Sequence, residues 1–191
     1  MKFAYVIFFA LLLTFQAGAA NGPNGRLGLD LGTGLLSDYG FLGLGARYFV
    51  SGWQDLHASV GADPNGGMIG VGSRLYYHLA ASKCFFIIPC DQRLFMGVTA
   101  LRSGGGLVSV TDGGAAGSYN QSSGLAGSVT LGEYNVFWNH VSLGFEIGYR
   151  WWIHRPALAY VSGVQSTQLE NDVAAWSKNS MTVALTLGWL F

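Results

Sequence analysis

The last eleven residues, 181–191, constrain the fold of this chain more than any other stretch. Large apolar side chains fall at every second position from Met181 to Phe191, and the positions between them are mostly small or hydroxyl-bearing. Alternation with a period of two is typical of a β-strand with one apolar and one polar face. The stretch therefore predicts a strand that ends on an aromatic residue.

The amino terminus has the features of a secretory signal peptide. Lys2 supplies a positive charge, residues 3–15 form an apolar run, and residues 17–20 (Ala-Gly-Ala-Ala) offer a small-residue cleavage site. The run is shorter than the roughly 20 residues of a membrane-spanning helix. We expect residues 1–20 to be a cleaved signal peptide and residues 21–191 to form a single mature domain. A retained membrane anchor is the alternative.

The composition favours a strand-rich membrane protein over a soluble enzyme. Charged residues make up 10% of the chain, against about 25% in a typical soluble protein. The chain also has 29 glycines and 14% aromatic residues, and after residue 20 no apolar run approaches the length of a spanning helix. A formal net charge of zero gives no indication of a nucleic-acid partner.

Eight segments alternate apolar with small or polar residues over about the 9–11 residues that a transmembrane strand requires. The sequence therefore predicts an all-β fold, an eight-stranded antiparallel transmembrane β-barrel with up-and-down meander order. A soluble sandwich or lipocalin-like barrel is the competing fold, but its outward faces should be polar and often charged. The expected strands cover residues 26–36, 40–50, 55–62, 68–79, 92–102, 124–134, 139–152 and 181–191.

The connections agree with this arrangement, because the two long ones, 103–123 and 153–179, fall on the same end of the barrel. We expect 103–123 to be a flexible display loop and 153–179 to contact lipopolysaccharide or another protein. Aromatic residues should collect at the two membrane boundaries. One boundary is predicted at Tyr48, Trp53, Tyr77, Tyr134, Trp138, Trp189 and Phe191, and the other at Tyr39, Phe41, Tyr149, Trp151 and Trp152.

These features resemble a known family of proteins. The signal peptide, the eight strands, and the motifs Gly-Ala-Arg-Tyr-Phe at 45–49, Gly-Phe-Glu-Ile-Gly-Tyr-Arg-Trp at 144–151 and Gly-Trp-Leu-Phe at 188–191 are similar to small outer-membrane β-barrels of the OmpA/OmpX-, OmpW- and opacity-protein-like group. The resemblance implies the outer membrane of a Gram-negative bacterium, contact with outer-membrane lipid and lipopolysaccharide, and insertion by the barrel assembly machinery. Trp189 and Phe191 would form the C-terminal assembly signal.

Several charged residues are predicted to face the barrel interior. An eight-stranded barrel is just wide enough for side chains to fill it, and isolated charges there would be costly, so we expect pairing. Asp30 and Glu146 should lie close enough to share an arginine. The main interpretation is a charge network that plugs the barrel, and the alternative is a proton- or ion-conducting path. The network is predicted at Asp30, Arg47, Arg74, Glu146 and Arg150, together with Arg93, His57 and His78.

Glycines on the predicted inner faces have two interpretations. They would either leave a cavity that opens to the cell exterior and admits a small apolar solute, or relieve crowding in a narrow barrel. The residues concerned are Gly32, Gly34, Gly43, Gly45, Gly70, Gly72 and Gly148.

Cys84 and Cys90 are predicted to form a disulfide, because an exported chain meets an oxidising periplasm. We expect no metal site, no cofactor and no catalytic centre. A faint likeness of His140, Ser142 and Glu146 to lipid A 3-O-deacylases fails on spacing, because residues 140 and 146 of one strand lie roughly 20 Å apart. The expected function is that of a structural envelope component or a surface-loop interaction or adhesion protein. A narrow pore or binding barrel is the first alternative, and an outer-leaflet lipid A-modifying enzyme is the second.

Overall fold

The structure is a computed structural model that describes residues 24–63, 66–79, 83–84, 88–112, 115–175 and 177–191. Eight antiparallel strands form a barrel in the order β4-β3-β2-β1-β12-β10-β9-β6, and pairing of β4 with β6 closes it. The predicted all-β fold, a closed eight-stranded antiparallel barrel, is therefore confirmed. The barrel strands are β1 (Leu27–Leu35), β2 (Leu42–Ser51), β3 (Gln54–Asp63), β4 (Gly66–His78), β6 (Ile88–Ser103), β9 (Gly124–Phe137), β10 (Val141–His154) and β12 (Ser180–Leu190).

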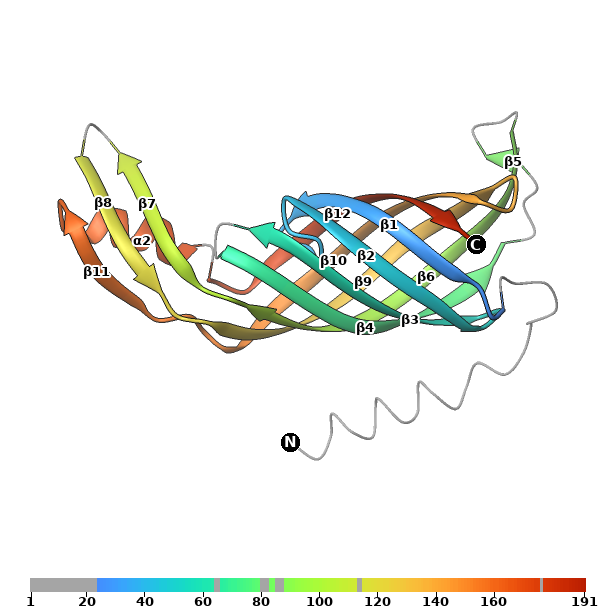
Figure 1. The fold of residues 1–191 in the computed structure, drawn as a ribbon, viewed down its shortest axis with the longest axis horizontal. Helices are drawn as coiled ribbons and strands as arrows, with labels where there is room; N and C mark the ends of the chain where they lie inside the picture. Colours follow the sequence, from blue (N-terminus) through green and yellow to red (C-terminus); the bar gives the residue numbers. More distant parts are fainter. Residues whose placement is uncertain (1–23, 64–65, 80–82, 85–87, 113–114, 176) are drawn as a thin grey trace.

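Barrel strands that follow one another in the sequence lie side by side in the barrel, so the chain forms an up-and-down meander (Figure 1). Two longer segments, one after β6 and one after β10, extend away from the barrel; we call them the excursions. We call the end where β1 begins and β12 finishes the terminal end, and the opposite one the loop end. Both excursions leave the barrel at the loop end, as the connection lengths predict (Figure 1).

The two faces of the barrel wall have the predicted polarity. In β2, every second residue from Leu42 to Val50 is exposed, and the residues between them are buried. The same pattern holds in β12, where large apolar side chains point outward and Thr182 and Thr186 point inward. The outer wall is thus apolar, in contrast to the polar outer face of a lipocalin-like barrel, and most of the charged and hydroxyl-bearing residues of the wall face the interior.

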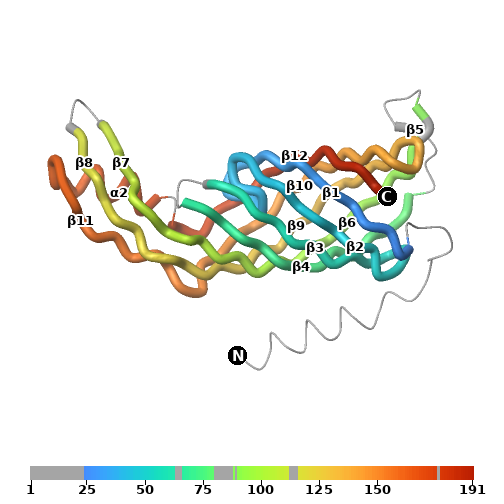
Figure 2. Tube along the Cα trace, viewed as in Figure 1, coloured from blue at the N-terminus to red at the C-terminus, as the bar shows by residue number. Residues whose placement is uncertain are grey.

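The long connections were expected to be loops, and this prediction is wrong. Residues 103–123 form the hairpin β7 (Gly106–Asp112) and β8 (Ala115–Gln121), and residues 153–179 contribute β11 (Leu158–Gly163) and α2 (Thr167–Ala175). The three strands form a separate sheet in the order β11-β8-β7, which we call the rim sheet. Figure 2 shows it extending the long axis of the molecule beyond the loop end.

The rim sheet has its own small core. Tyr119 of β8 packs against Leu169 and Val173 of α2, with partly buried Val108, Val110 and Leu158 around them. The hydroxyl of Ser166 accepts a hydrogen bond from the backbone N–H of Leu169 at 3.2 Å, so it caps the amino-terminal end of α2. These connections therefore have regular structure. Alternating side chains form strands in a segment rich in glycine and serine, and a capped helix packs against them.

At the terminal end the hairpins are tighter and the strands longer than expected. β9 continues to Phe137, and a turn of residues 138–140 with positive φ at Trp138 (49°) and Asn139 (63°) leads into β10. β6 starts at Ile88, and the two-residue strand β5 (Lys83–Cys84) pairs with its beginning.

Candidate functional site: the filled interior of the barrel

The first group of interior charges joins β1, β2 and β3. Arg47 Nε donates a hydrogen bond to Asp30 Oδ2 at 2.9 Å, and Arg47 Nη2 lies 2.7 Å from the same oxygen. Arg47 Nε also lies 3.8 Å from Oδ2 of Asp55, a buried acid that the sequence prediction did not include. The Tyr76 hydroxyl donates to Asp55 Oδ2 at 2.6 Å. Neighbouring strands thus bring opposite charges into contact, as buried ions require.

The second group spans the interior. Arg74 Nη2 of β4 donates to Glu146 Oε2 of β10 at 2.7 Å, and both side chains are almost completely buried. The expectation that Asp30 and Glu146 share an arginine is wrong, because Asp30 binds Arg47 and Glu146 binds Arg74. Arg74 pairs with Glu146 because its long side chain extends across the interior, in front of β6 and β9.

The remaining predicted charges differ in their surroundings. Arg150 is fully buried, and its guanidinium carbon lies 5.1 Å from the ring centre of Trp152. Arg93 is buried, pairs with Asp91, and donates to the backbone carbonyl of Gly52 at 2.8 Å. The prediction that His78 faces the interior is wrong. Its side chain is 55% exposed and pairs with Asp91 near the end of β4.

Below these charges, towards the terminal end, aromatic side chains fill the barrel. Arg47 stacks over the Tyr134 ring, with 4.3 Å between its guanidinium carbon and the ring centre, and Arg74 stacks over Phe95 at 4.8 Å. Ring centres within the cluster lie 5.6–6.2 Å apart. The arginines therefore contact both acids and rings. The cluster consists of Phe49, Tyr76, Phe95, Tyr134, Val136 and Leu190.

Towards the loop end the interior is filled by a turn that sequence reasoning did not identify. The connection between β1 and β2 folds into the barrel, and we call its residues Ser37 to Gly40 the plug turn; all four are buried. Asp38 Oδ2 accepts a hydrogen bond from Thr99 at 2.5 Å, and its Oδ1 accepts one from Ser128 at 3.0 Å. An acidic residue in a short turn between glycine-rich strands is the only sequence signal for this arrangement.

Tyr39 was predicted at the membrane boundary, and this prediction is wrong: its side chain is 1% exposed inside the barrel. The ring occupies space that Gly32 and Gly45 leave free. A Cβ atom on Gly45 would lie 2.8 Å from Tyr39 Cε1, and one on Gly32 would overlap the ring. These glycines therefore make room for a side chain from the turn and line no open cavity.

Two further aromatic residues lie inside rather than at a boundary. Tyr134 is buried in the interior cluster, and Trp152 packs against Met68 and Leu101 at the loop end. Both stand at even-numbered positions, as the inward-facing residues of their strands do. Alternation along the strand therefore decides which way they point, and their aromatic character does not. Other predicted boundary residues do point outward and are exposed: Tyr48, Tyr77, Trp138, Tyr149, Trp151, Trp189, Phe191 and Phe41.

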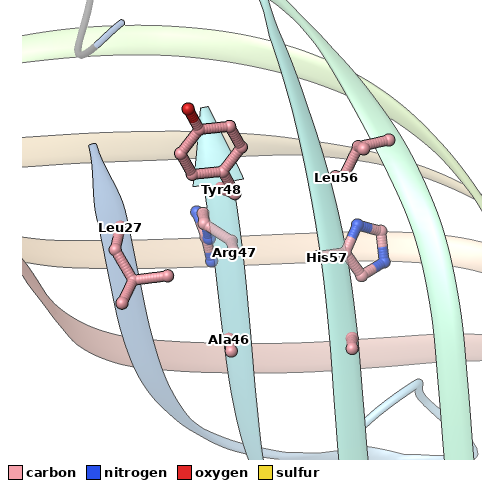
Figure 3. Close-up of a pocket in the computed structure, with 7 residues that line it drawn as sticks. Leu27, Ala46, Arg47, Tyr48, Leu56 and His57 are labelled. Carbon is pink, nitrogen blue, oxygen red and sulfur yellow. The ribbon is translucent and has the colours of Figure 1, made fainter. Parts of the chain in front are cut away.

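Near the interior charges, the outer surface of the barrel has only shallow depressions. A depression of about 220 Å³ lies where Leu27 of β1, Tyr48 of β2 and Leu56 of β3 are neighbours on the outer surface; these residues are drawn in Figure 3. Arg47 and His57 occupy the adjacent positions of β2 and β3, and both are buried in the interior network. The depression is thus part of the apolar outer surface.

The predicted assembly signal lies on the outside of the last strand. Trp189 stacks on the His140 ring with 5.4 Å between ring centres, and Arg26 Nε donates to the carbonyl of Phe191 at 3.0 Å. A role in assembly stays a prediction. The predicted disulfide also stays one, because the side chain of Cys84 lies outside the described part of the structure.

The geometry assembles no catalytic group from the residues considered earlier. Ser142 and Glu146 point into the barrel, whereas His140 sits in the turn before β10, exposed and stacked on Trp189. Within the described ranges, no cluster of three or more metal-ligating side chains occurs. In the same ranges, no helix is long and apolar enough to cross a membrane.

Comparison with known proteins gives a similarity of fold. No protein-family model matches the chain, and no curated protein matches it. Among solved structures, the N-terminal β-barrel domain of Pseudomonas aeruginosa OprF is similar, with a TM-score of 0.46 and 11% sequence identity. The alignment covers 88% of this chain and 98% of that domain.

Proposed function

We propose that this chain is an outer-membrane β-barrel with a plugged interior, acting as a structural envelope component or as a surface interaction protein. The observation that carries the proposal is the combination of an apolar outer wall with an interior filled by paired charges and aromatic side chains. Lipid can solvate the apolar outer wall, and the filled interior leaves no room for a water-filled channel.

Support for membrane insertion comes from side chains that a soluble protein would bury. Leu31, Leu44 and Leu187 lie side by side on the outer wall and are 49%, 60% and 55% exposed. A contiguous apolar surface of this kind requires a partner, and hydrocarbon covers all strands of a barrel equally. Exposed aromatics at both ends of the strands fit the two interfaces of a bilayer.

Conductance tests the plugged interior against the alternative of a narrow pore. The Arg74–Glu146 pair and the aromatic cluster cross the interior, so we expect the protein in planar bilayers to give no regular current steps. Insertion is verified by protease protection of the barrel in lipid vesicles of the same composition. Regular single-channel steps from the inserted protein would contradict a plugged interior and favour a pore for small solutes.

The rim sheet is the proposed contact surface for an extracellular protein or for lipopolysaccharide, because it stands beyond the loop end and its strands expose apolar side chains such as Leu107, Tyr160 and Val161 beside polar ones. We assign no catalytic centre and no cofactor. Expression of the chain should leave the mass of lipid A unchanged, and a new lipid A species would contradict this assignment.

We also propose the disulfide between Cys84 and Cys90, in the β5–β6 hairpin at the terminal end. Unreduced protein should resist alkylation, whereas protein treated with reductant should gain two alkyl groups by mass spectrometry. A Cys84→Ser variant, which should gain one group without reduction, provides the control.

A further inference from the structure

The plug turn places two different chemical groups in the interior. Tyr39 contributes a phenol ring, and the adjacent Asp38 contributes a carboxylate. Neither group belongs to a strand of the barrel wall, since β1 ends at Leu35 and β2 starts at Leu42. The wall therefore contains a recess whose occupant is brought in from a connection.

The part of the recess that holds the ring is shaped by missing side chains. Gly32 of β1 and Gly45 of β2 face the ring, and any Cβ atom at either position would meet it. Cβ atoms on Gly43 and Gly61 would meet the backbone carbonyl of Tyr39. Four glycines on three neighbouring strands thus leave a space that a planar ring and its backbone fill.

The part that holds the carboxylate is lined by donors. Thr99 of β6 and Ser128 of β9 each donate a hydroxyl hydrogen bond to one Asp38 oxygen, at 2.5 and 3.0 Å. His57 Nε2 lies 3.7 Å from Asp38 Oδ2 and 3.1 Å from the Thr99 hydroxyl. Two hydroxyls and an imidazole from three strands are a suitable receptor for a carboxylate.

A bridge between Gly40 and Ala62 of β3 ties the turn to the wall, whereas the ladder of β1 with β2 ends at the pair Gly32–Gly43 and does not include the turn. Leu36, which precedes the turn, and Gly40, its last residue, have φ values of 56° and 63°. For Leu36 this conformation is costly, which marks a backbone held in place by its contacts. Asp38 and Tyr39 contact the wall through their side chains, through a hydrogen bond from Ser59 to the Asp38 carbonyl, and through the Tyr39 carbonyl, which lies close to Gly43 and Gly61.

We propose that this recess is a binding site for a small aromatic carboxylate, and that Tyr39 and Asp38 occupy it when the ligand is absent. The solute would present a planar ring to the glycines and its carboxylate to Thr99 and Ser128. The aromatic cluster and the Arg74–Glu146 pair close the recess towards the terminal end, so the site binds and does not conduct. The inference goes beyond the proposed function, which needs only that the interior be filled.

Removal of the internal occupant tests the site. The double variant Asp38→Ala/Tyr39→Gly, purified in detergent as the full mature chain, is titrated with 4-hydroxyphenylacetate by calorimetry. We expect a Kd at least tenfold lower than that of the wild type, because the competing ring and carboxylate are gone. Adding Thr99→Val should weaken this binding about tenfold, and p-cresol, which lacks the carboxylate, should bind more weakly. Phe41→Ala, at an exposed aromatic of the same connection, should behave as wild type.

The position of the intact turn provides the second measurement. Ser37 is 2% exposed, so the thiol of a Ser37→Cys variant should react slowly with a bulky maleimide. Saturating 4-hydroxyphenylacetate should accelerate labelling several-fold, and cyclohexane should not. No binding by the folded double variant, or no change in the labelling of this thiol by the acid, would overturn the site. If the double variant does not fold, the labelling experiment alone decides. Conductance of the wild type, by contrast, would overturn the plugged interior and leave this result unaffected.

Discussion

The guanidinium of Arg74 lies 2.7 Å from the carboxylate of Glu146, although two strands, β6 and β9, separate the strands that carry them. Because both side chains are buried, each is the counter-charge that makes burial of the other tolerable. The pair ties together distant parts of the wall across the interior.

Removing one partner of this pair should be costly. Glu146→Gln leaves Arg74 buried without its counter-charge, and we expect the free energy of unfolding to fall by about 3–5 kcal/mol. The double variant Arg74→Met/Glu146→Leu should cost less than the sum of its single variants. Urea unfolding in lipid vesicles measures these values, with Glu170→Gln on α2 as a control that should change stability by less than about 0.5 kcal/mol. Additive losses in the double variant would mean that the two residues act independently.

A methyl group at Gly32 should interfere with the plug turn. Its Cβ would overlap the Tyr39 ring, so Gly32→Ala should destabilise the protein by about 1–3 kcal/mol and speed maleimide labelling when it is combined with Ser37→Cys. Gly67→Ala is the matched control, because a Cβ there meets no atom within 4 Å. Equal labelling rates in the two glycine variants would show that Tyr39 does not depend on the space at Gly32.

The apolar outer wall should not tolerate charge. Leu31 lies on the outward face midway along β1, and Leu31→Arg should reduce the free energy of folding into vesicles by about 2–4 kcal/mol, the cost of arginine near the middle of a bilayer. Ala159→Arg, at an exposed position of the rim sheet, should fold as the wild type does. Tolerance of arginine at position 31 would argue that lipid does not cover this face.

The rim sheet should lose its order without its helix. Leu169 is 1% exposed in the small core, and Leu169→Ala should destabilise this unit by about 2–5 kcal/mol while the barrel remains closed. Limited trypsin digestion followed by mass spectrometry should then detect faster cleavage after Lys178. Val164→Ala, which truncates a side chain that is 48% exposed, serves as the control. Simultaneous digestion of the barrel would contradict an independent core.

The sequence predicts the barrel well because period-two alternation depends only on local residues. It places all eight strands and both faces, and errors are confined to strand ends such as those of β6 and β9. Alternation also indicates which way Tyr134 and Trp152 point. The boundary assignment failed for them because it followed aromatic type and ignored parity.

The plug turn and the rim sheet lie beyond local patterns. Whether Asp38 and Tyr39 point outward or fold inward depends on Thr99, Ser128 and Gly45, which come from other strands. In the rim sheet, the alternation of Val108 and Val110 is short and lies among glycines and serines, so composition suggested a loop. Long-range contacts decide both features.

The seam between β1 and β12, in which Gly28 pairs with Leu190 and Leu35 with Val183, has a consequence for the order of events during biogenesis. β1 leaves the ribosome early but has one hydrogen-bonding partner missing until residues 183–190 have been synthesised. The ring therefore cannot seal before residues 183–190 have been made, and until then the chain depends on something else to shield the unpaired backbone of its first strand.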